Sequence, residues 1–410
     1  MRKASACAAP TWTGKPPRHL DSLIKQRVTE GMETYLDHNA TTAMDGRVLD
    51  EMLPFLQLHH GNPSALYRQG RLARQAVETA REQVAELVNA HPSQVVFTSG
   101  GTEANNLAIK GVVARPQCLA VSAIEHASVL APARQAAGQG GVVEIGVDEQ
   151  GRVTEAGLAQ ALVKQPALVS VMLANNETGV IQDVAALAAL AQRHKVPFHT
   201  DAVQAAGKIA VDYAALGVQL MTLSSHKIYG PKGVGALVLD PGLDLQPQMV
   251  GGGQERDYRS GTENVAAIVG FGKAAELAAR ELAQRQVRTE ALCQQLLTGL
   301  AQMENVVVFA GDAPRLPNTV YLALRGIDGE ALIMEMDRAG VAVASGSACD
   351  SRKADVSHVL KAMGVDQTLA KAAVRVSVGK DNTPADIENF LQVLKRQAQV
   401  LEDNAMLAWA

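Results

Sequence analysis

The chain has 410 residues, of which 47% are hydrophobic and 20% charged, an ordinary balance for a soluble globular protein with room for two domains. Its net charge of −4 shows no bias toward nucleic acid or an anionic membrane, and no apolar run approaches the roughly 20 residues that a membrane helix needs. Four scattered cysteines predict neither a disulfide framework nor a zinc site and fit a reducing compartment, the cytoplasm: Cys7, Cys118, Cys293 and Cys349.

Residues 1–31 form a basic leader in which Asp21 and Glu30 are the only acids. The segment lacks the apolar core of a secretory signal, and its prolines break any long amphipathic helix. We favour a disordered tail, or a true start at Met32, with an organelle transit peptide as the alternative.

From Tyr35 onward the chain alternates helical and strand-like segments. Apolar residues at helical spacing predict a helix over 65–89 and a second, Ala- and Leu-rich helix over 184–195. Short apolar runs predict buried strands at 95–97, 119–122, 168–173, 219–223 and 236–239. This alternation predicts an α/β fold with a mostly parallel central sheet covered by helices.

After Gly251–Gly253 the pattern changes to that of a smaller α+β domain. Residues 265–303 read as a long helix, followed by strands at 306–309, 319–324, 341–344 and 374–378 and by helices at 329–339, 356–363 and 384–401. We therefore divide the chain into a leader (1–31), an N-terminal arm that packs with the small domain (32–45), a large α/β domain (46–283) and a small C-terminal domain (284–410) that carries the Cys349 loop.

Two residues about one strand–helix–strand unit apart point to a cofactor. Lys227 follows the strand-like run 219–223, and a lysine at a strand end can form a Schiff base with a carbonyl compound. Asp201 ends an earlier apolar run. An aldehyde cofactor with a pyridine ring needs both, a lysine for its aldehyde and an acid for its ring nitrogen. Each alone reads as an exposed loop lysine or a helix-capping acid, but together they favour pyridoxal 5'-phosphate.

A glycine-containing loop, 98–106, follows the strand at 95–97 and opens a helix. Its glycines let the backbone approach an anion, Thr102 supplies a hydroxyl, and the helix start supplies free N–H groups. The loop is neither a Walker A loop nor a GxGxxG fingerprint. It predicts a phosphate cradle, with an ordinary capped helix start as the alternative.

Further polar residues follow other strands. His126 can stack on a flat ring or exchange protons, Asn175 can hold a phenolic oxygen or form a turn, and Gln204 lies three residues after Asp201. His126, Asn175, Asp201 and Lys227 all lie just past the carboxyl ends of predicted strands. Because open α/β sheets bind ligands at that edge, we expect these side chains to converge there.

Two residues of the second domain complete the set. Cys349 lies in a small polar loop without the apolar neighbours that would bury it, which makes it a candidate nucleophile, with a free surface cysteine as the alternative. Arg375 lies inside an apolar strand, and a buried guanidinium needs an anion. That anion is either a substrate α-carboxylate, held in bidentate fashion, or an acidic side chain in a structural salt bridge.

These motifs resemble those of the cysteine desulfurases of the class V aminotransferase superfamily, which are fold-type I enzymes that use pyridoxal phosphate. The resemblance runs from Tyr35-Leu-Asp-His-Asn-Ala-Thr-Thr42 to the C-terminal helix and includes the motifs at 61–64, 98–106, 174–179, 201–204, 224–233, 251–253 and 259–262. The loop Ser345-Gly-Ser-Ala-Cys349 is the most discriminating element. It is similar to that of the long-loop group that supplies iron–sulfur assembly, whereas selenocysteine-lyase-like enzymes have a shorter loop.

The resemblance implies a role for each candidate. Lys227 would hold the cofactor and move the substrate's α-proton, Asp201 would keep the pyridine nitrogen protonated, and His126 would stack on the ring and assist acid–base steps. The remaining cofactor contacts would come from Asn175 and Gln204 at the ring oxygen and from Gly101, Thr102, Ser224, Ser225 and His226 at the phosphate. Thr262 would reach the phosphate of the neighbouring subunit, which implies a homodimer, and Asn175 and Arg375 would hold the substrate carboxylate.

By the same resemblance, Cys349 would take the sulfur of L-cysteine as a persulfide, leaving L-alanine, and pass it to an iron–sulfur scaffold protein or another acceptor. The persulfide would also be a candidate iron–sulfur ligand. Asp350 stands where Thr or Ser is usual, and its charge should raise the pKa of the thiol unless Arg352 and Lys353 offset it. Selenocysteine lysis and transamination are the alternative activities; they need Lys227 but not Cys349. We expect no membrane or nucleic-acid partner.

Overall fold

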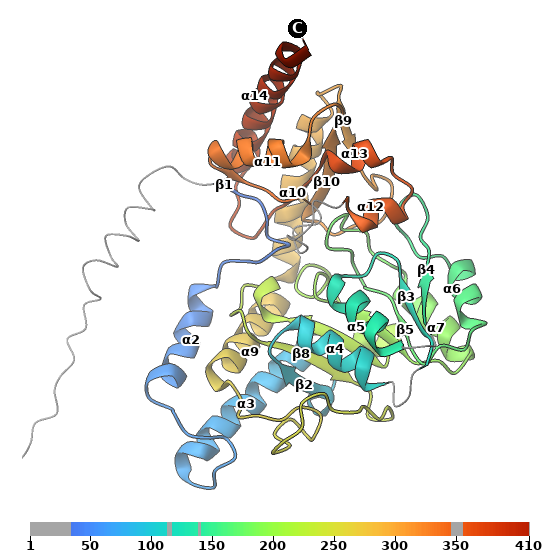
Figure 1. Cartoon of the computed structure of the whole chain (residues 1–410). Helices are drawn as coiled ribbons and strands as arrows, with labels where there is room; N and C mark the ends of the chain where they lie inside the picture. The colour runs from blue at the N-terminus through green and yellow to red at the C-terminus, as the bar shows by residue number, and fades with distance from the viewer. Residues whose placement is uncertain (1–33, 113–116, 138–140, 346–355, 410) are drawn as a thin grey trace, which may run out of the picture.

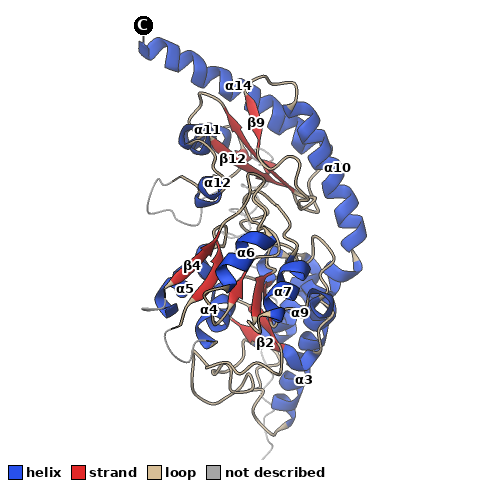
Figure 2. Ribbon diagram, turned by 90° about the vertical axis from the view of Figure 1, so that its right-hand side faces the viewer, coloured by secondary structure: helices blue, strands red, loops and turns tan. Residues whose placement is uncertain are grey.

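The computed structural model describes residues 34–112, 117–137, 141–345 and 356–409. The leader 1–31 and the loop with Cys349 lie outside these residues. The described chain forms a seven-stranded sheet, a three-stranded sheet and a two-stranded pairing of β1 (Thr34–Tyr35) with β11 (Val341–Ala342). Figures 1 and 2 show the larger sheet and its helices below and the smaller sheet above.

The central sheet is mostly parallel, as the sequence predicts. Its order is β2-β8-β7-β6-β5-β3-β4, and only β8 runs antiparallel to its neighbours β2 and β7. The strands are β2 (Val95–Thr98), β3 (Leu119–Ser122), β4 (Val142–Ile145), β5 (Val169–Ser170), β6 (Phe198–Asp201), β7 (Leu220–Ser224) and β8 (Gly235–Leu239). Every residue of these strands except in β4 is buried, which explains their continuous apolar runs.

Helices cover both faces of this sheet. Because side chains alternate along a strand, Val95 and Phe97 pack on one face and Val96 on the other. The first face carries α2 (Gly46–Gln57), α3 (Arg68–Leu87), α6 (Glu155–Leu162), α7 (Val184–Arg193), α8 (Tyr213–Leu216) and α9 (Val265–Arg280). The second carries α4 (Gly101–Gly111) and α5 (Ala127–Ala137). Two short 3-10 turns, η1 (Pro92–Gln94) and η3 (Ser225–Lys227), flank β2 and β7.

The smaller sheet has its own core. It is antiparallel, in the order β12-β10-β9, with β9 (Val306–Val308), β10 (Thr319–Leu324) and β12 (Ala373–Ser377). One side packs on α10 (Leu282–Leu300), α11 (Gly329–Arg338) and α14 (Pro384–Trp409). On the other side, α12 (His358–Ala362) and α13 (Gln367–Lys371) share an apolar cluster with Ile124 and Met172, which follow strands of the larger sheet. This cluster packs the smaller sheet over the carboxyl edge of the larger one. No helix in the described ranges is long and apolar enough to cross a membrane.

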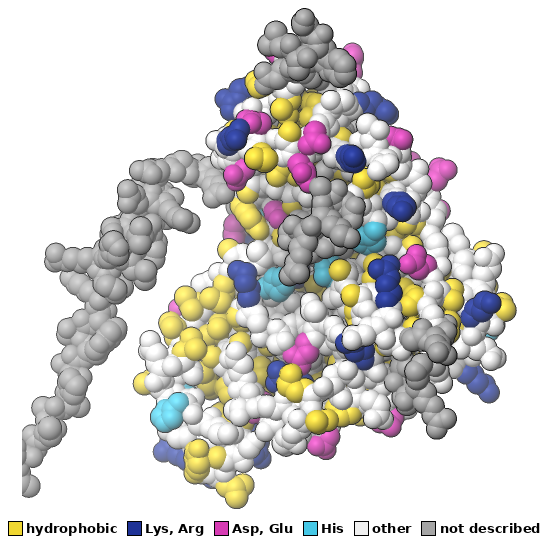
Figure 3. Space-filling view, viewed as in Figure 1, with side chains coloured by type: hydrophobic (Ala, Val, Ile, Leu, Met, Phe, Trp, Pro, Cys, Tyr) yellow, Lys and Arg dark blue, Asp and Glu magenta, His cyan; other side chains and the backbone are white. Residues whose placement is uncertain are grey.

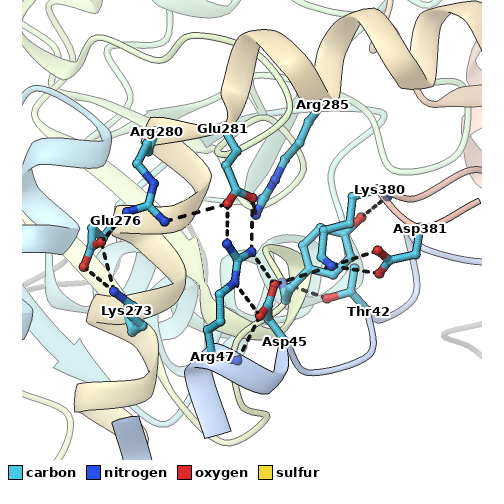
Figure 4. A network of polar contacts seen from close by, with 11 residues as sticks. Thr42, Asp45, Arg47, Lys273, Glu276, Arg280, Glu281, Arg285, Lys380 and Asp381 are labelled. Atoms are coloured by element: carbon cyan, nitrogen blue, oxygen red, sulfur yellow. Dashed lines mark hydrogen bonds and ion pairs between the residues drawn. The ribbon is translucent and has the colours of Figure 1, made fainter. Parts of the chain in front are cut away.

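The long helix expected over 265–303 is two helices, α9 and α10, which meet at Glu281. The Glu281 carboxylate accepts from Arg47 Nη1 at 2.6 Å and from Arg285 Nη2 at 2.9 Å (Figure 4). Arg47 also pairs with Asp45 at 2.8 Å, and Lys380 Nζ lies 3.4 Å from Asp45. This network links the start of α2, the helix junction and the segment after β12. The break and the separate cores support our proposed division of the chain near residue 283.

Candidate functional site

The candidate side chains lie at the carboxyl edge of the central sheet. Gly101 follows β2, His126 follows β3, Asn175 follows β5, Asp201 ends β6, and Lys227 follows β7. Because these strands are parallel, their loops meet at one edge. The structure therefore brings these five residues to the same edge of the sheet.

The loop before α4 has the shape of an anion cradle. A Cβ built on Gly101 would lie 3.1 Å from Val203 Cγ2 and 3.5 Å from Ser224 Cβ, so a side chain there would crowd the end of β7. Gly100 has a φ of +152° and caps α4 without a side-chain hydrogen bond, so the cap expected from Thr102, which is exposed, does not form. Because no side chain among the described residues caps α4, its first N–H groups are available to an anion.

Ser224 supplies further hydrogen-bond capacity beside this cradle, whereas the Ser225 hydroxyl lies against Gly230 in the loop after Lys227. The hydroxyls of Ser224 and Ser225 are buried and have no hydrogen-bond partner among the described residues. His226 places Nδ1 3.1 Å from Thr41 Oγ1, and burial lowers the pKa of His226 to about 4, so its ring is neutral. The group as a whole offers donors without adding a negative charge, as a phosphate site requires.

Asp201 is buried and accepts two hydrogen bonds. Val203 N–H donates to Oδ1 at 2.9 Å, and Asn105 Nδ2 donates to Oδ2 at 2.8 Å. Asn105 Nδ2 also lies 2.8 Å from Ser128 Oγ, which in turn lies 2.7 Å from His126 Nδ1. The structure thus connects Asp201 to His126 through two residues that the sequence analysis did not single out.

The N-terminal arm holds the candidate lysine. Lys227 Nζ donates to the backbone oxygens of Asn39 at 2.6 Å and Ala40 at 2.7 Å. The arm is fixed there because Thr42 N–H and Oγ1 both donate to His226 O, at 3.0 and 2.9 Å. Tyr229, two residues after the lysine, adopts a left-handed φ of +70° and donates its N–H to Thr42 Oγ1. The arm and the lysine loop therefore form one unit.

Gln204 is held by the same arm and by a second lysine. Its Nε2 donates to Asn39 O at 3.0 Å, and its Oε1 accepts from Lys208 Nζ at 2.7 Å. Lys208 also donates to Asn39 Oδ1 at 2.7 Å. Burial and the neighbouring Lys227 hold the pKa of Lys208 well below its usual value. The orientation of the Gln204 amide is thereby set, with its nitrogen toward the arm.

Asn175 and Arg375 show the structural alternatives that the sequence left open. Asn175 Oδ1 accepts from the N–H groups of a tight turn at residues 177 and 178, and its Nδ2 donates to Ile124 O at 3.1 Å. Arg375 Nη2 pairs with Asp37 at 2.6 Å, and Nη1 donates to Asn176 O at 3.0 Å. Arg375 Nε, however, is buried without a partner among the described residues, so the guanidinium retains binding capacity.

Two further predicted residues are not part of these contacts. Thr262 is exposed on the loop before α9. Cys349, the candidate nucleophile and iron–sulfur ligand, lies outside the described residues. Within the described ranges, no group of His, Cys, Asp and Glu side chains could hold a metal ion.

Sequence reasoning missed several residues that the site uses. Asn39 and Asp37 lie in the motif at 35–42. That motif is part of the family resemblance, but it did not indicate a function for either residue. Lys208 follows the motif at 201–204, and an isolated lysine there gave none. Ser128 lies in the first turn of α5, where such a residue ordinarily reads as a cap, and Asn105 lies in the second turn of α4, where an asparagine gives no signal of a role.

Comparisons with known proteins agree with this arrangement. A family model described as aminotransferase class-V matches residues 34–390. A cysteine desulfurase from Cereibacter sphaeroides is 44% identical over 367 residues, covering 88% of this chain and 94% of the relative. The solved structure of a NifS-like protein from Rickettsia africae superposes with a TM-score of 0.83 at 35% identity, covering 90% of this chain and all of that one. A structure of SspA in complex with cysteine gives a TM-score of 0.75 at 30% identity and covers 85% of this chain and 99% of that one.

Proposed function

The chain belongs to the aminotransferase class-V family and, within it, to the cysteine desulfurases, and from this premise we propose that it uses pyridoxal 5'-phosphate to remove sulfur from L-cysteine for iron–sulfur cluster assembly. The observation that carries the proposal is the convergence of Lys227, Asp201 and the α4 cradle at one edge of the sheet. A lysine, a carboxylate and an anion site are the three groups that this cofactor needs.

The residues present fit the cofactor. The first N–H groups of α4 and the Ser224 hydroxyl, which has no partner among the described residues, suit its phosphate, and Asp201, an acceptor through both oxygens, suits a protonated ring nitrogen. When bound, pyridoxal phosphate withdraws electrons from the α-carbon of an attached amino acid. Gln204, with its amide set by Lys208, would bind at the ring oxygen.

Lys227 is the group placed to move a proton at the substrate α-carbon. Its Nζ lies between two backbone oxygens of the arm, which orient the amine but are not bases that would retain its proton. Burial and the charge of Lys227 lower the pKa of Lys208. When Lys208 is neutral, it adds no positive charge next to the Lys227 amine. With Nζ oriented in this way, Lys227 would act as the base at the α-carbon.

Arg375 would bind the α-carboxylate of L-cysteine. The bare Nε and the Nη2 that pairs with Asp37 lie on one guanidinium, and such a fork binds carboxylates in bidentate fashion. Asp37 would hold the guanidinium in place before substrate arrives. Asn175, whose amide is engaged in its turn, would contribute by positioning that turn.

The sulfur step would use Cys349. Its thiolate would attack the sulfur of cofactor-bound L-cysteine, so that an S–S bond forms as the C–S bond breaks. The β-carbon of the substrate would take a proton, so that the product leaves as L-alanine. Cys349 would keep the sulfur as a persulfide. An iron–sulfur scaffold protein would then accept that sulfur.

If Thr262 contacts the cofactor phosphate bound by a neighbouring subunit, the protein must be a homodimer. Helix α2 buries Val48 and Met52 against the core but exposes a second apolar stripe, Leu49, Leu53 and Leu56, at helical spacing. Figure 3 shows hydrophobic side chains gathered over α2. An exposed apolar face of this kind is typical of a subunit interface, and a second copy of the chain is the occupant we propose.

The test is to incubate the protein with pyridoxal phosphate, L-cysteine and a thiol reductant and to measure sulfide and alanine. We expect equal amounts of both. Lys227→Ala should lose both products and the visible absorbance of the lysine-bound cofactor. Cys349→Ser should lose sulfide release, and a variant that kept it would refute the desulfurase assignment in favour of another class V reaction.

Cys118→Ser is the matched control, since Cys118 is a free, partly exposed cysteine far from the site on β3's N-terminal side. It should release sulfide at the wild-type rate. Selenocysteine lysis and transamination are separated by the same assay, because neither needs Cys349.

A further inference from the structure

His126 Nδ1 accepts hydrogen bonds, and this fixes where its proton lies. The backbone N–H of Ser128 can only donate, and it points to Nδ1 at 3.1 Å. Nδ1 must therefore carry its lone pair there. A neutral imidazole with a bare Nδ1 has its proton on Nε2.

The Ser128 hydroxyl completes the same assignment. Ser128 Oγ lies 2.8 Å from Asn105 Nδ2, which donates to it, and 2.7 Å from His126 Nδ1. Having accepted from Asn105, the hydroxyl is free to direct its own hydrogen to Nδ1. The serine therefore supplies His126 with two donors, one from its backbone and one from its side chain.

The orientation of the Asn105 amide is set by Asp201. A carboxylate oxygen accepts and does not donate, so the atom of Asn105 that lies 2.8 Å from Asp201 Oδ2 is the amide nitrogen. A flipped amide would place its oxygen against that carboxylate. The charge on Asp201 thus fixes the direction of each hydrogen bond in turn: Asn105 donates to Ser128, and the Ser128 hydroxyl donates to His126.

From these contacts we propose that Asn105 and Ser128 are positioning residues that hold His126 as the neutral imidazole with its proton on Nε2. The inference rests on the proposed function and sharpens one part of it. His126 then serves the reaction as a hydrogen-bond donor through Nε2, and accepting a proton from substrate falls to Lys227. Protonating Nδ1 would set it against the backbone N–H of Ser128, a donor–donor contact, and would require the Ser128 hydroxyl to turn its hydrogen away and accept instead, which opposes the cationic form.

The direct test is nitrogen NMR of the holoenzyme labelled with ¹⁵N-histidine, with His126 assigned by its loss in His126→Gln. At pH 7.5 we expect a protonated Nε2 and an unprotonated Nδ1. A protonated Nδ1, in either the other tautomer or the cation, overturns the proposal. This readout does not depend on turnover, so a failed desulfurase assay and a failed tautomer assignment are distinguishable.

Substitutions test the two positioning residues. Ser128→Ala keeps the backbone N–H but loses the hydroxyl, so it should weaken the preference for the Nε2 tautomer and lower kcat/KM with L-cysteine about three- to ten-fold, the effect of losing one hydrogen bond. Ser128→Thr, which restores the hydroxyl, should recover both. If Ser128→Ala leaves the tautomer ratio and kcat/KM unchanged, the Ser128 hydroxyl does not help to set the tautomer of His126.

Asn105 acts through Ser128 in this scheme, so its effect should vanish when the hydroxyl is gone. Asn105→Leu alone should mix the tautomers, whereas adding it to Ser128→Ala should change the tautomer ratio no further. Additive shifts in the double variant would show that Asn105 does not act on His126 through the serine.

Discussion

Glu125 is a carboxyl buried beside the site, next to His126. Ser122 Oγ and Met172 N–H both donate to its Oε1 at 2.6 Å, while Oε2 has no partner among the described residues. Burial raises the pKa of Glu125 to about 8 from an ordinary 4.5. The folded protein therefore keeps a proton on this group at neutral pH that the unfolded chain releases.

This difference predicts how stability depends on pH. Between about pH 4.5 and 8 the folded state binds the Glu125 proton and the unfolded state does not, so the group's contribution to stability is lost as pH rises through that window. Glu125→Gln removes the titration. Relative to the variant, the wild type should lose up to about 1.4 kcal/mol of unfolding free energy per pH unit, measured by urea unfolding at pH 5, 6.5 and 8.

Buried histidines give the opposite trend but cancel in this comparison. Burial lowers the pKa of His38 to about 4 and that of His199 to about 3, so their contributions are lost as pH falls below the unfolded value of 6.5, equally in wild type and variant. The control is Glu86→Gln, an exposed position on α3. If the wild-type and Glu125→Gln stabilities run parallel with pH, the carboxyl does not fold protonated.

For individual residues, the sequence predicts those that have a chemically suitable side chain and lie at the end of a strand. Lys227 and Asp201 can be found because each ends an apolar run. The partners that orient them, Asn39, Lys208 and Asn105, cannot, since their contacts join positions far apart in the chain. Only the fold reveals which polar neighbour a buried group uses.

Among the elements, strands with a continuous apolar run were predicted, including the half-exposed β9, and the strand interrupted by a charged residue, β4, was not. β3 spans the expected residues 119–122, whereas the edge strand β4, whose side chains are mostly part-exposed, has no continuous apolar signal. The break between α9 and α10 carries no Gly or Pro in the sequence. It depends on Arg47 and Arg285 meeting Glu281, and such tertiary contacts leave no local pattern.

A buried ion pair ties α3 to the loop before α9. Arg81 donates from Nη1 and Nη2 to the two oxygens of Glu255, at 2.7 and 3.0 Å, and Phe97 N–H donates to the same carboxylate at 3.0 Å. Both side chains are nearly inaccessible, at 4% and 2% exposed. The pair fixes the loop that leads to Thr262.

Removing one partner should be far more damaging here than at the surface. Glu255→Ala leaves the buried guanidinium of Arg81 with only the half-exposed Glu78 as a counter-charge and should lower the free energy of unfolding by about 3–5 kcal/mol. Glu144→Ala, at the exposed pair with Arg134, should cost less than about 1 kcal/mol. Chemical denaturation of both variants checks this, and similar losses in the two would contradict it.

For the whole molecule, the sequence predicted two α/β-type units and their sheet but not how they meet. The apolar cluster that joins α12 and α13 to Ile124 and Met172 depends on residues from both units. Each of those residues reads locally as ordinary core. The placement of Arg375 over the carboxyl edge of the central sheet follows from that docking and could not be predicted.

The exposed face of α2 predicts the oligomeric state. Leu56 on α2 is 61% exposed and Leu66, in the segment between α2 and α3, is 83% exposed, and a stable dimer would bury them. Leu56→Asp combined with Leu66→Asp should convert a dimer to a monomer in sedimentation experiments and, if Thr262 serves the partner's site, weaken cofactor retention. Val287→Asp on α10, where the valine is 70% exposed, is the matched control and should stay dimeric. A double variant of unchanged mass would place the interface elsewhere.

The pairing of Ala344 with Arg375 of β12 has a mechanical consequence. Ala344, just before the segment that carries Cys349, exchanges two backbone hydrogen bonds with Arg375, at 2.7 and 3.3 Å. The guanidinium on that rung is the one we assign to the amino-acid carboxylate. Because these hydrogen bonds couple the two residues, any shift of the Arg375 backbone when the carboxylate binds would also move Ala344, the residue just before the segment that carries Cys349.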